Sequence, residues 1–114
     1  MTEPDTSYAD ESPLVTLLGN AGKTKMLSAF VTERGRELTI SEIARFSGVA
    51  RSTVYDHIDA LLELGVIKHT RDTNDGHSTL YQLNEQSEIA DLLYKLDGVI
   101  LSELIDEEHQ RVNK

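Results

Sequence analysis

Apolar residues recur at helical spacing in two short runs between Leu38 and Val66. The second run places four apolar residues on one face of a helix over residues 51–64: Val54, Ile58, Leu61 and Leu62. The first run gives a shorter apolar face: Ile43, Ala44 and Phe46. The pattern therefore predicts two short helices that pack on a common core and are joined by a tight turn.

Local signals mark the ends of both helices. Thr39 and Glu42 have the spacing of a capping box, in which each side chain satisfies a free amide at the start of a helix. Gly48 and Gly65 follow the two apolar runs and predict their ends. At Gly48 the turn needs either a positive φ angle or close backbone approach. The small residues Ala44 and Gly48 would also let the two helices approach each other closely.

The start of the second helix is polar: Arg51, Ser52, Thr53, Tyr55 and Asp56. With these residues, the stretch ISEIARFSGVARSTVYDHIDALLELGVI closely resembles the DNA-reading part of winged helix-turn-helix transcription regulators of the MarR/ArsR-like type. These are small, usually dimeric proteins that bind duplex DNA. The resemblance covers about two thirds of the chain, and it implies a mainly α fold with a small β-hairpin and a second helix lying in the major groove. Two helices of an unrelated bundle are the alternative.

The resemblance also implies roles for the residues at the start of the second helix. Arg51 would bind guanine or an adjacent phosphate, and Ser52 and Thr53 would bind phosphates or base edges. Tyr55 would contact the backbone or a thymine methyl group. Asp56 would accept a hydrogen bond from cytosine or repel phosphates at other sequences.

Residues 66–71 and 78–83 are rich in β-branched and alternating side chains, and Asp75-Gly76 between them is a strong turn signal. They predict a hairpin, which the resemblance identifies as the wing, over residues 66–83. In that family the wing lies along the minor groove or the flanking phosphates. The candidate contacts are Arg71 and, less strongly, Lys68, His69 and His77, and a solvated tip that makes no contact is the alternative.

Two elements are expected before the capping box. After an acidic arm over residues 1–11, which we expect to be flexible, Pro13 suits the first turn of a short helix, and Asn20 suits the cap of a longer one ending near Glu33. The longer helix would contribute Met26, Leu27, Phe30 and Val31 to the core. The glycines near Lys23 are too closely spaced for a phosphate-binding loop. Lys23 and Lys25 are candidates for contact with the DNA backbone, or are simply solvated.

Residues 85 to about 108 read as one long helix, and residues 84–110 as a dimerisation segment after a DNA-binding domain at 12–83. Its apolar stripe has no unpaired long element in the chain to cover it, so we expect a second copy to do so. The predicted dimerisation residues are Leu14, Leu17, Leu18, Ile89, Leu92, Leu93, Leu96, Val99, Ile100 and Leu104. A homodimer predicts a palindromic operator with half-sites about one helical turn apart. Packing of the long helix on the first helix of the same subunit is the alternative, and the two are compatible.

The formal net charge of −9 by itself argues against DNA binding, but the distribution of the charge does not. Residues 1–20 hold four acids and no bases, residues 21–82 eight of each, and residues 83–114 eight acids and three bases. The bases of the middle segment are expected where DNA phosphates would lie, with Arg45 among the predicted DNA-binding residues: Lys23, Lys25, Arg34, Arg36, Arg45, Arg51, Lys68 and Arg71. Many acids with few lysines also resemble the proteins of halophilic archaea, and an ordinary acidic cytoplasmic protein is the alternative. Salt adaptation would predict a shallow dependence of DNA affinity on salt, because cations held by acidic side chains would offset counterion release.

Other chemistries lack a signal in the sequence. The chain has no cysteine, which excludes disulfides and thiolate chemistry. Its histidines, at positions 57, 69, 77 and 109, are too far apart for a short metal motif. No nucleophile or pocket signature is recognisable, so neither an enzyme nor a cofactor is expected. Without an apolar span or a signal peptide, a cytoplasmic protein that does not enter the membrane is expected. A protein-interaction module and an effector-sensing switch remain the alternatives to a DNA-binding regulator.

Overall fold

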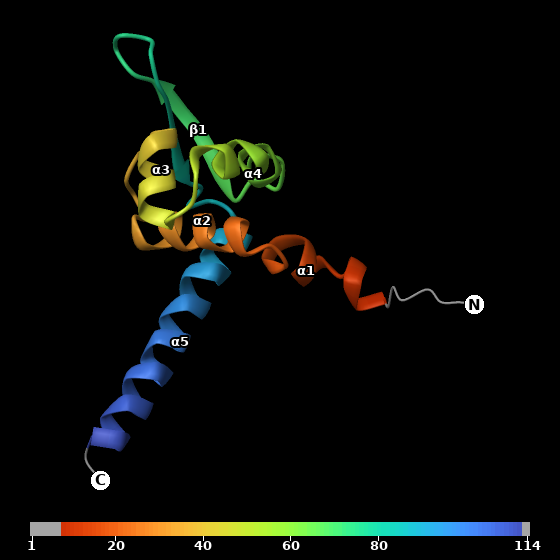
Figure 1. Cartoon of the computed structure of the whole chain (residues 1–114), viewed down its shortest axis with the longest axis vertical. Helices are drawn as coiled ribbons and strands as arrows, with labels where there is room; N and C mark the ends of the chain where they lie inside the picture. Colours follow the sequence, from red (N-terminus) through yellow and green to blue (C-terminus); the bar gives the residue numbers. More distant parts are fainter. Residues whose placement is uncertain (1–7, 113–114) are drawn as a thin grey trace.

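The computed structural model of the chain describes residues 8–112, and the side chains of residues 9–108. Its elements in order are η1 (Tyr8–Glu11), α1 (Pro13–Leu18), α2 (Ala21–Thr32), α3 (Ile40–Ser47), α4 (Arg51–Glu63), β1 (Ile67–Asp72), β2 (Thr79–Leu83) and α5 (Glu88–Val112). The segment from α2 to β2 forms a head, and α1 and α5 leave it in different directions as two arms (Figure 1). Of the predicted flexible arm, residues 1–7 lie outside the described residues, and the last four form the 3₁₀ helix η1.

Three of the predicted helix starts are confirmed by hydrogen bonds. The Asn20 side chain accepts from the Lys23 amide at 3.0 Å and caps α2. At α3, the Thr39 hydroxyl accepts from the Glu42 amide at 3.1 Å, while the Glu42 carboxylate accepts from the Thr39 amide at 2.9 Å. Pro13 occupies the first turn of α1 behind a Ser12 cap. These local bonds stabilise three of the four helices that precede or build the head.

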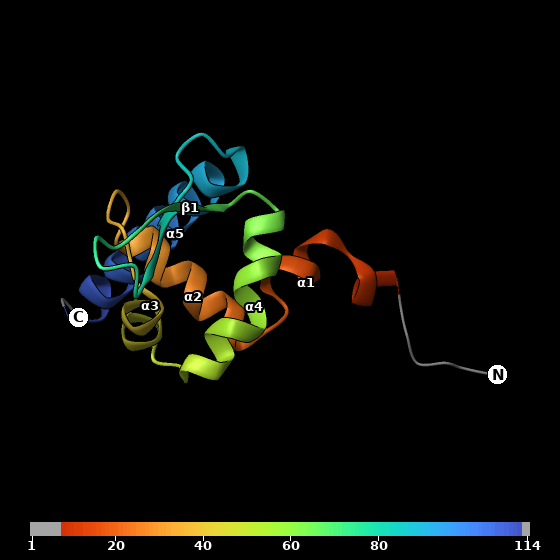
Figure 2. The same ribbon diagram turned by 90° about the horizontal axis from the view of Figure 1, so that it is seen from above.

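The turn between α3 and α4 depends on the conformation of Gly48. Its φ of 72° is left-handed, and a Cβ added there would meet nothing within 4 Å. The positive φ predicted for Gly48 is therefore confirmed, whereas the prediction that it allows close helix approach is wrong, because the space around it is open. Close approach occurs instead at Gly22 of α2, where a Cβ would lie 2.7 Å from the Thr53 methyl carbon on α4. Figure 2 shows α3 and α4 on the two flanks of α2.

The core lies between α2, α3, α4 and the inner side of the hairpin. Its largest fully buried side chains are Phe30, Met26, Leu38, Ile43, Leu61, Ile67, Val54 and Val66. The predicted core residues of α2 and α4 are buried, except that Leu62 is only partly buried. Phe46 was expected on the apolar face of α3, but it is 36% exposed. The guanidinium groups of Arg36 and Arg45 lie over its ring, at 5.2 and 4.9 Å from the centroid.

The hairpin pairs β1 with β2 in antiparallel register, from Ile67 opposite Leu83 to Asp72 opposite Thr79. Leu38, just before α3, forms an isolated bridge with Tyr81. Two backbone bonds make this bridge, at 2.7 Å from the Leu38 amide and 2.9 Å from the Tyr81 amide. The extended piece expected around Leu38 thus attaches the wing to the start of α3.

The helix α5 begins at Glu88, three residues later than predicted. The delay has a local cause, because the Asn84 side chain donates to the Gly65 carbonyl and accepts from the Gln86 amide. Ser87 then caps the helix by accepting from the Ala90 amide at 3.1 Å. The first turns of α5 pack on α2, and the helix projects away from α1 instead of folding back along it (Figure 1).

Candidate nucleic-acid interface

The start of α4 presents its polar residues to solvent. Arg51, Ser52 and Asp56 are exposed, and Tyr55 keeps 57% of its surface accessible. Val54, between them, is fully buried. Because the buried residue anchors the turn in the core, its neighbours are held outward on a rigid element. Thr53 differs, since it is half-buried with its methyl group against Gly22.

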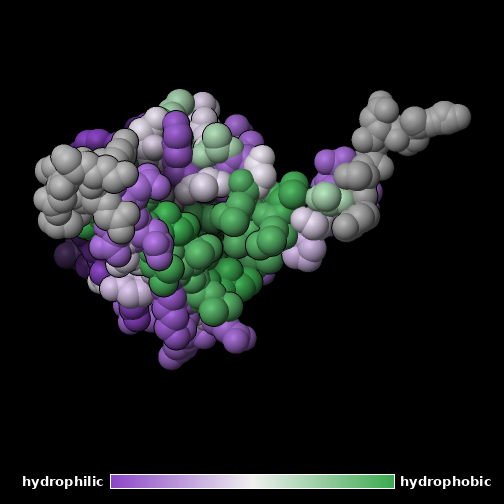
Figure 3. Space-filling model, turned by 90° about the horizontal axis from the view of Figure 1, so that it is seen from below, coloured by the Kyte–Doolittle hydropathy of each residue, from purple (hydrophilic) through white to green (hydrophobic). Residues whose placement is uncertain are grey.

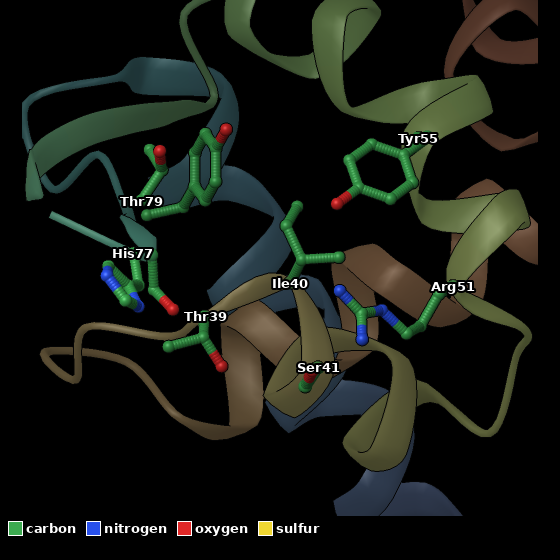
Figure 4. Close-up of a pocket in the computed structure, with 9 residues that line it drawn as sticks. Thr39, Ile40, Ser41, Arg51, Tyr55, His77 and Thr79 are labelled. Carbon is green, nitrogen blue, oxygen red and sulfur yellow. The ribbon is translucent and has the colours of Figure 1, made fainter. Parts of the chain in front are cut away.

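A hollow of about 170 Å³ lies between the start of α4, the start of α3 and the wing. It is lined by Thr39, Ile40, Ser41, Arg51, Tyr55, His77, Ser78, Thr79 and Tyr81. In Figure 4, the Arg51 and Tyr55 side chains extend from α4 towards Ile40, and His77 and Thr79 come from the opposite side. Three predicted DNA-binding residues, Arg51, Tyr55 and His77, are therefore brought to one place, although His77 is far from the other two in the sequence.

The chemistry of the hollow favours a polar, negatively charged ligand. Arg51 supplies a permanent positive charge, and Tyr55 and Ser41 supply hydroxyl groups. Burial, with the negative charge of Asp59, raises the pKa of the Tyr81 hydroxyl, so this group stays protonated and can donate a hydrogen bond at neutral pH. The arrangement suits binding of a sugar-phosphate chain by charge and hydrogen bonds.

Several of the predicted bases are already engaged within the protein. Arg71 is paired with Glu37 at 3.1 Å, and Arg34 with Glu85 at 3.6 Å. The Lys23 ammonium group donates to the Thr16 carbonyl oxygen at 2.9 Å, near the end of α1. Arg36 is also engaged, because it pairs with Glu33 and Glu42. The remaining four bases of the segment are exposed and form no ion pair with any other residue that the structure describes: Lys25, Arg45, Arg51 and Lys68.

Sequence reasoning missed six residues that line the hollow: Thr39, Ile40, Ser41, Ser78, Thr79 and Tyr81. Part of the signal was present. Thr79 and Tyr81 are two apart on a predicted strand, so they share a face, and Ser41 stands in the first turn of a helix that the capping box had located. The meeting of these two surfaces depends on the packing of the wing, which no local pattern reveals.

His69, another wing candidate, lies beside Asp72 at 3.4 Å and near the Tyr81 ring.

Within residues 8–112, no group of three or more side chains has the arrangement of a metal site. None of the helices in the same range is long and apolar enough to cross a membrane.

The head is a winged helix-turn-helix, of the kind found in transcription regulators. It consists of a helix, a glycine turn, a second helix with an exposed polar start, and a hairpin attached beside them. In agreement, residues 26–71 match the family model described as the IclR helix-turn-helix domain. A comparison with curated protein sequences found no match.

Solved structures with this fold include AdcR, the adhesin competence repressor of Streptococcus pyogenes, with a TM-score of 0.64 and 18% identity over 79% of this chain and 64% of that one. ZitR of Lactococcus lactis, a zinc-responsive MarR family member, has a TM-score of 0.62 and 20% identity over 76% of this chain and 58% of its own. FabT of Streptococcus pneumoniae, solved in complex with DNA, has a TM-score of 0.61 and 18% identity over 84% and 68%. The chain thus spans less than two thirds of the AdcR and ZitR chains, and at these identities the likeness is one of fold.

Proposed function

We propose that this protein is a transcription regulator that binds specific duplex DNA as a homodimer. The start of α4 enters the major groove, and the wing follows the minor groove or the backbone. One observation carries the proposal. The exposed residues Arg51 and Tyr55 face a polar hollow shared with the wing and the start of α3, so one continuous surface offers both a reading helix and backbone donors. ZitR and FabT, with the same fold, were solved bound to DNA.

Exposed positive charge on this surface and elsewhere in the head supports the same use. Arg45, Arg51 and Lys68 come from three elements of the head and are free of ion pairs with the other described residues, so they can meet phosphates. The acidic excess of the chain lies outside residues 21–82. A protein of negative net charge can therefore present a surface that attracts DNA.

Binding is tested by selecting duplexes from a random pool and then measuring equilibrium affinity. Arg51→Ala is expected to weaken binding of the selected duplex by about 1–3 kcal/mol, because a guanidinium that contacts a base is lost. Lys95→Ala is the matched control, because it also removes one positive charge but lies on α5. The proposal is wrong if the wild type selects no sequence, or if Arg51→Ala binds as tightly as the wild type.

The dimer proposal rests on apolar surface that the described part of the chain leaves uncovered. Seven large apolar side chains of α5 are between 48% and 59% exposed: Leu92, Leu96, Val99, Ile100, Leu101, Leu104 and Ile105. Leu14, Val15 and Leu18 of α1 are also exposed, and Figure 3 shows a continuous hydrophobic surface on this side of the molecule. A monomer rarely leaves such a surface in water, so a second copy of the chain is the proposed cover.

Not every residue predicted for the dimer is available to a partner. Leu17, Ile89 and Leu93 pack on the core of the head in their own subunit. They border two hollows with mainly apolar linings, one of about 200 Å³ between α2 and α5 and one of about 440 Å³ beside α1. These hollows can receive apolar side chains from the second subunit.

Sedimentation tests the dimer directly. Wild type is expected to sediment as a dimer at micromolar concentration, and Leu96→Asp to shift it towards monomer, because a charge would be buried in the apolar interface. Ser102→Asp, an exposed position on the same helix, is the control that should remain dimeric. A wild-type monomer at micromolar concentration would remove the argument for a palindromic operator.

A further inference from the structure

One of the predicted DNA contacts has a different arrangement from the others. The Arg71 guanidinium, at the outer part of β1, faces the Glu37 carboxylate, which lies 34 residues earlier in the link between α2 and α3. Its Nε donates to Glu37 Oε2 at 3.2 Å, and its Nη2 donates to Oε1 at 3.1 Å. This is the two-point fork in which guanidinium and carboxylate geometries match, and it fixes direction as well as distance.

A β-bulge precedes this contact. The pairing of β1 with β2 shifts between His69 and Arg71, so that Thr70 has no partner of its own in the ladder. The Thr70 hydroxyl donates instead to the Leu80 carbonyl oxygen at 3.2 Å. A bulge bends a strand and redirects the side chains that follow it, and here it is followed by the side chain that reaches Glu37.

The ion pair stands next to a second attachment of the wing. Leu38, adjacent to Glu37, forms the two backbone bonds to Tyr81. The base of the hairpin is fixed by Ile67 and Leu83, which are buried in the core, and by the Leu38 bridge. Arg71 adds a contact to the outer part of β1 and so limits how far that part can bend. Since Tyr81 and Thr79 line the hollow opposite Arg51, the angle of the wing sets the width of that hollow.

The Glu37–Arg71 ion pair is expected to contribute little to the free energy of folding. Both side chains are substantially exposed, at 56% for Arg71 and 31% for Glu37, and exposed ion pairs contribute little to folding. A phosphate that approached Arg71 would also have to displace a carboxylate from two of its donors. The geometry therefore fits an orienting contact better than a DNA contact.

We infer that Glu37 and Arg71 form a positioning pair that presets the angle of the wing for DNA, and that Arg71 does not itself bind phosphate. The inference rests on the proposed function. The Glu37 carboxylate takes the place that a DNA phosphate would take in a direct contact, and the wing is thereby oriented before DNA arrives. Preset geometry raises affinity because less freedom is lost on binding.

Charge reversal distinguishes the two roles of Arg71. Glu37→Arg and Arg71→Glu are each expected to weaken binding of the selected duplex roughly tenfold, a usual coupling for residues in direct contact. The double variant Glu37→Arg/Arg71→Glu has the same net charge as the wild type and can re-form the pair. It is expected to return to within about threefold of wild-type affinity.

Glu37→Gln gives an independent readout with opposite signs for the two roles. It is expected to weaken binding, because the orienting contact is lost, whereas removal of a competing carboxylate would tighten binding if Arg71 bound phosphate. Arg71→Gln serves as the mild partner variant should a reversed charge prevent folding, which circular dichroism would show.

Three results would overturn the inference: a double variant as weak as Arg71→Glu, tighter binding by Glu37→Gln, or single variants that bind like the wild type. Each of them requires a wild type that binds DNA. A wild type that binds no duplex is the separate result that overturns the proposed function.

Discussion

The head and the arms of this protein use similar apolar residues in opposite ways. In the head, residues such as Phe30, Ile43 and Leu61 come from three helices and meet in one core, where 0–1% of their surface is exposed. In α5, Leu96 and Leu104 belong to an equally regular stripe but keep 49% and 57% of their surface exposed. The difference lies in the packing partners, because the apolar faces of the head helices pack on one another, whereas most of the α5 stripe has no such partner in the described part of the chain.

The charges divide along the same line. The head has equal numbers of acids and bases, and some of them form ion pairs between distant segments, such as Arg71 with Glu37. In α5, Lys95 pairs with Asp91 of the same helix at 2.9 Å. Contacts in the head therefore fix how elements sit against each other, whereas the contact in α5 supports only its own helix. The comparison suggests a head that folds as a unit and an arm whose position depends on a partner.

The largest expected effect is a difference in stability between the same truncation, leucine to alanine, made in the head and in α5. Leu61→Ala should destabilise the head by about 2–5 kcal/mol, because it opens a cavity in a fully packed core. Leu104→Ala removes the same atoms from an exposed site and should change the stability of the monomer by less than about 0.5 kcal/mol. Urea unfolding followed by circular dichroism measures both.

Two protein concentrations complete that measurement. The loss caused by Leu61→Ala should be the same at both, whereas Leu104→Ala should act through the concentration dependence of unfolding, because it weakens association. Equal losses from the two variants at high dilution would show that α5 is covered within its own subunit, and would contradict the division between head and arm.

A smaller effect, with opposite signs in the two regions, is expected from adding a methyl group to glycine. Gly48→Ala should destabilise the head by about 1–2 kcal/mol, because its φ of 72° is left-handed and strains any residue with a Cβ. Gly98→Ala should stabilise α5 by about 0.5–1 kcal/mol, because this glycine is inside a helix and an added Cβ meets nothing within 4 Å. Thermal unfolding of the two variants beside the wild type tests the pair. Destabilisation by Gly98→Ala would show that a partner lies close to that side of α5.

How much the sequence reveals also differs between local and distant features. The capping box at Thr39 and Glu42, the Asn20 cap and the turn at Gly48 depend on residues within a few positions of each other, and all three were predictable. The Glu37–Arg71 pair joins distant segments through a bulge, and the polar hollow depends on the same packing, so neither follows from periodicity. Local patterns thus predict the elements, and the site is completed by contacts between them.

Phe46 shows a failure of a different kind. The buried positions of α3 are Ile43, Ala44 and Ser47, with Ile40 packed against the core, which is the spacing of one helical face. Phe46 is off that face, and its size suggested burial where the spacing did not. Ser47 is tolerated inside because its hydroxyl donates to the Ile43 carbonyl oxygen. Spacing was the better guide than hydrophobicity.

The smallest expected effect concerns the attachment of the wing, and it appears as a pH dependence. The pKa of the Glu37 carboxyl is lowered from its ordinary value of 4.5, and the largest cause is its hydrogen bonding with the Arg71 guanidinium. The pair is therefore complete above about pH 4.5 and is lost as the pH falls through the lowered value, since protonation removes the charge that Arg71 holds. Nuclear magnetic resonance titration of the Glu37 carboxyl should give a midpoint below 4.5 in the wild type and a return towards 4.5 in Arg71→Gln. If Arg71→Gln left the midpoint unchanged, the ion pair would not form in solution, and the wing would be held only by the core packing of Ile67 and Leu83 and by the Leu38 bridge.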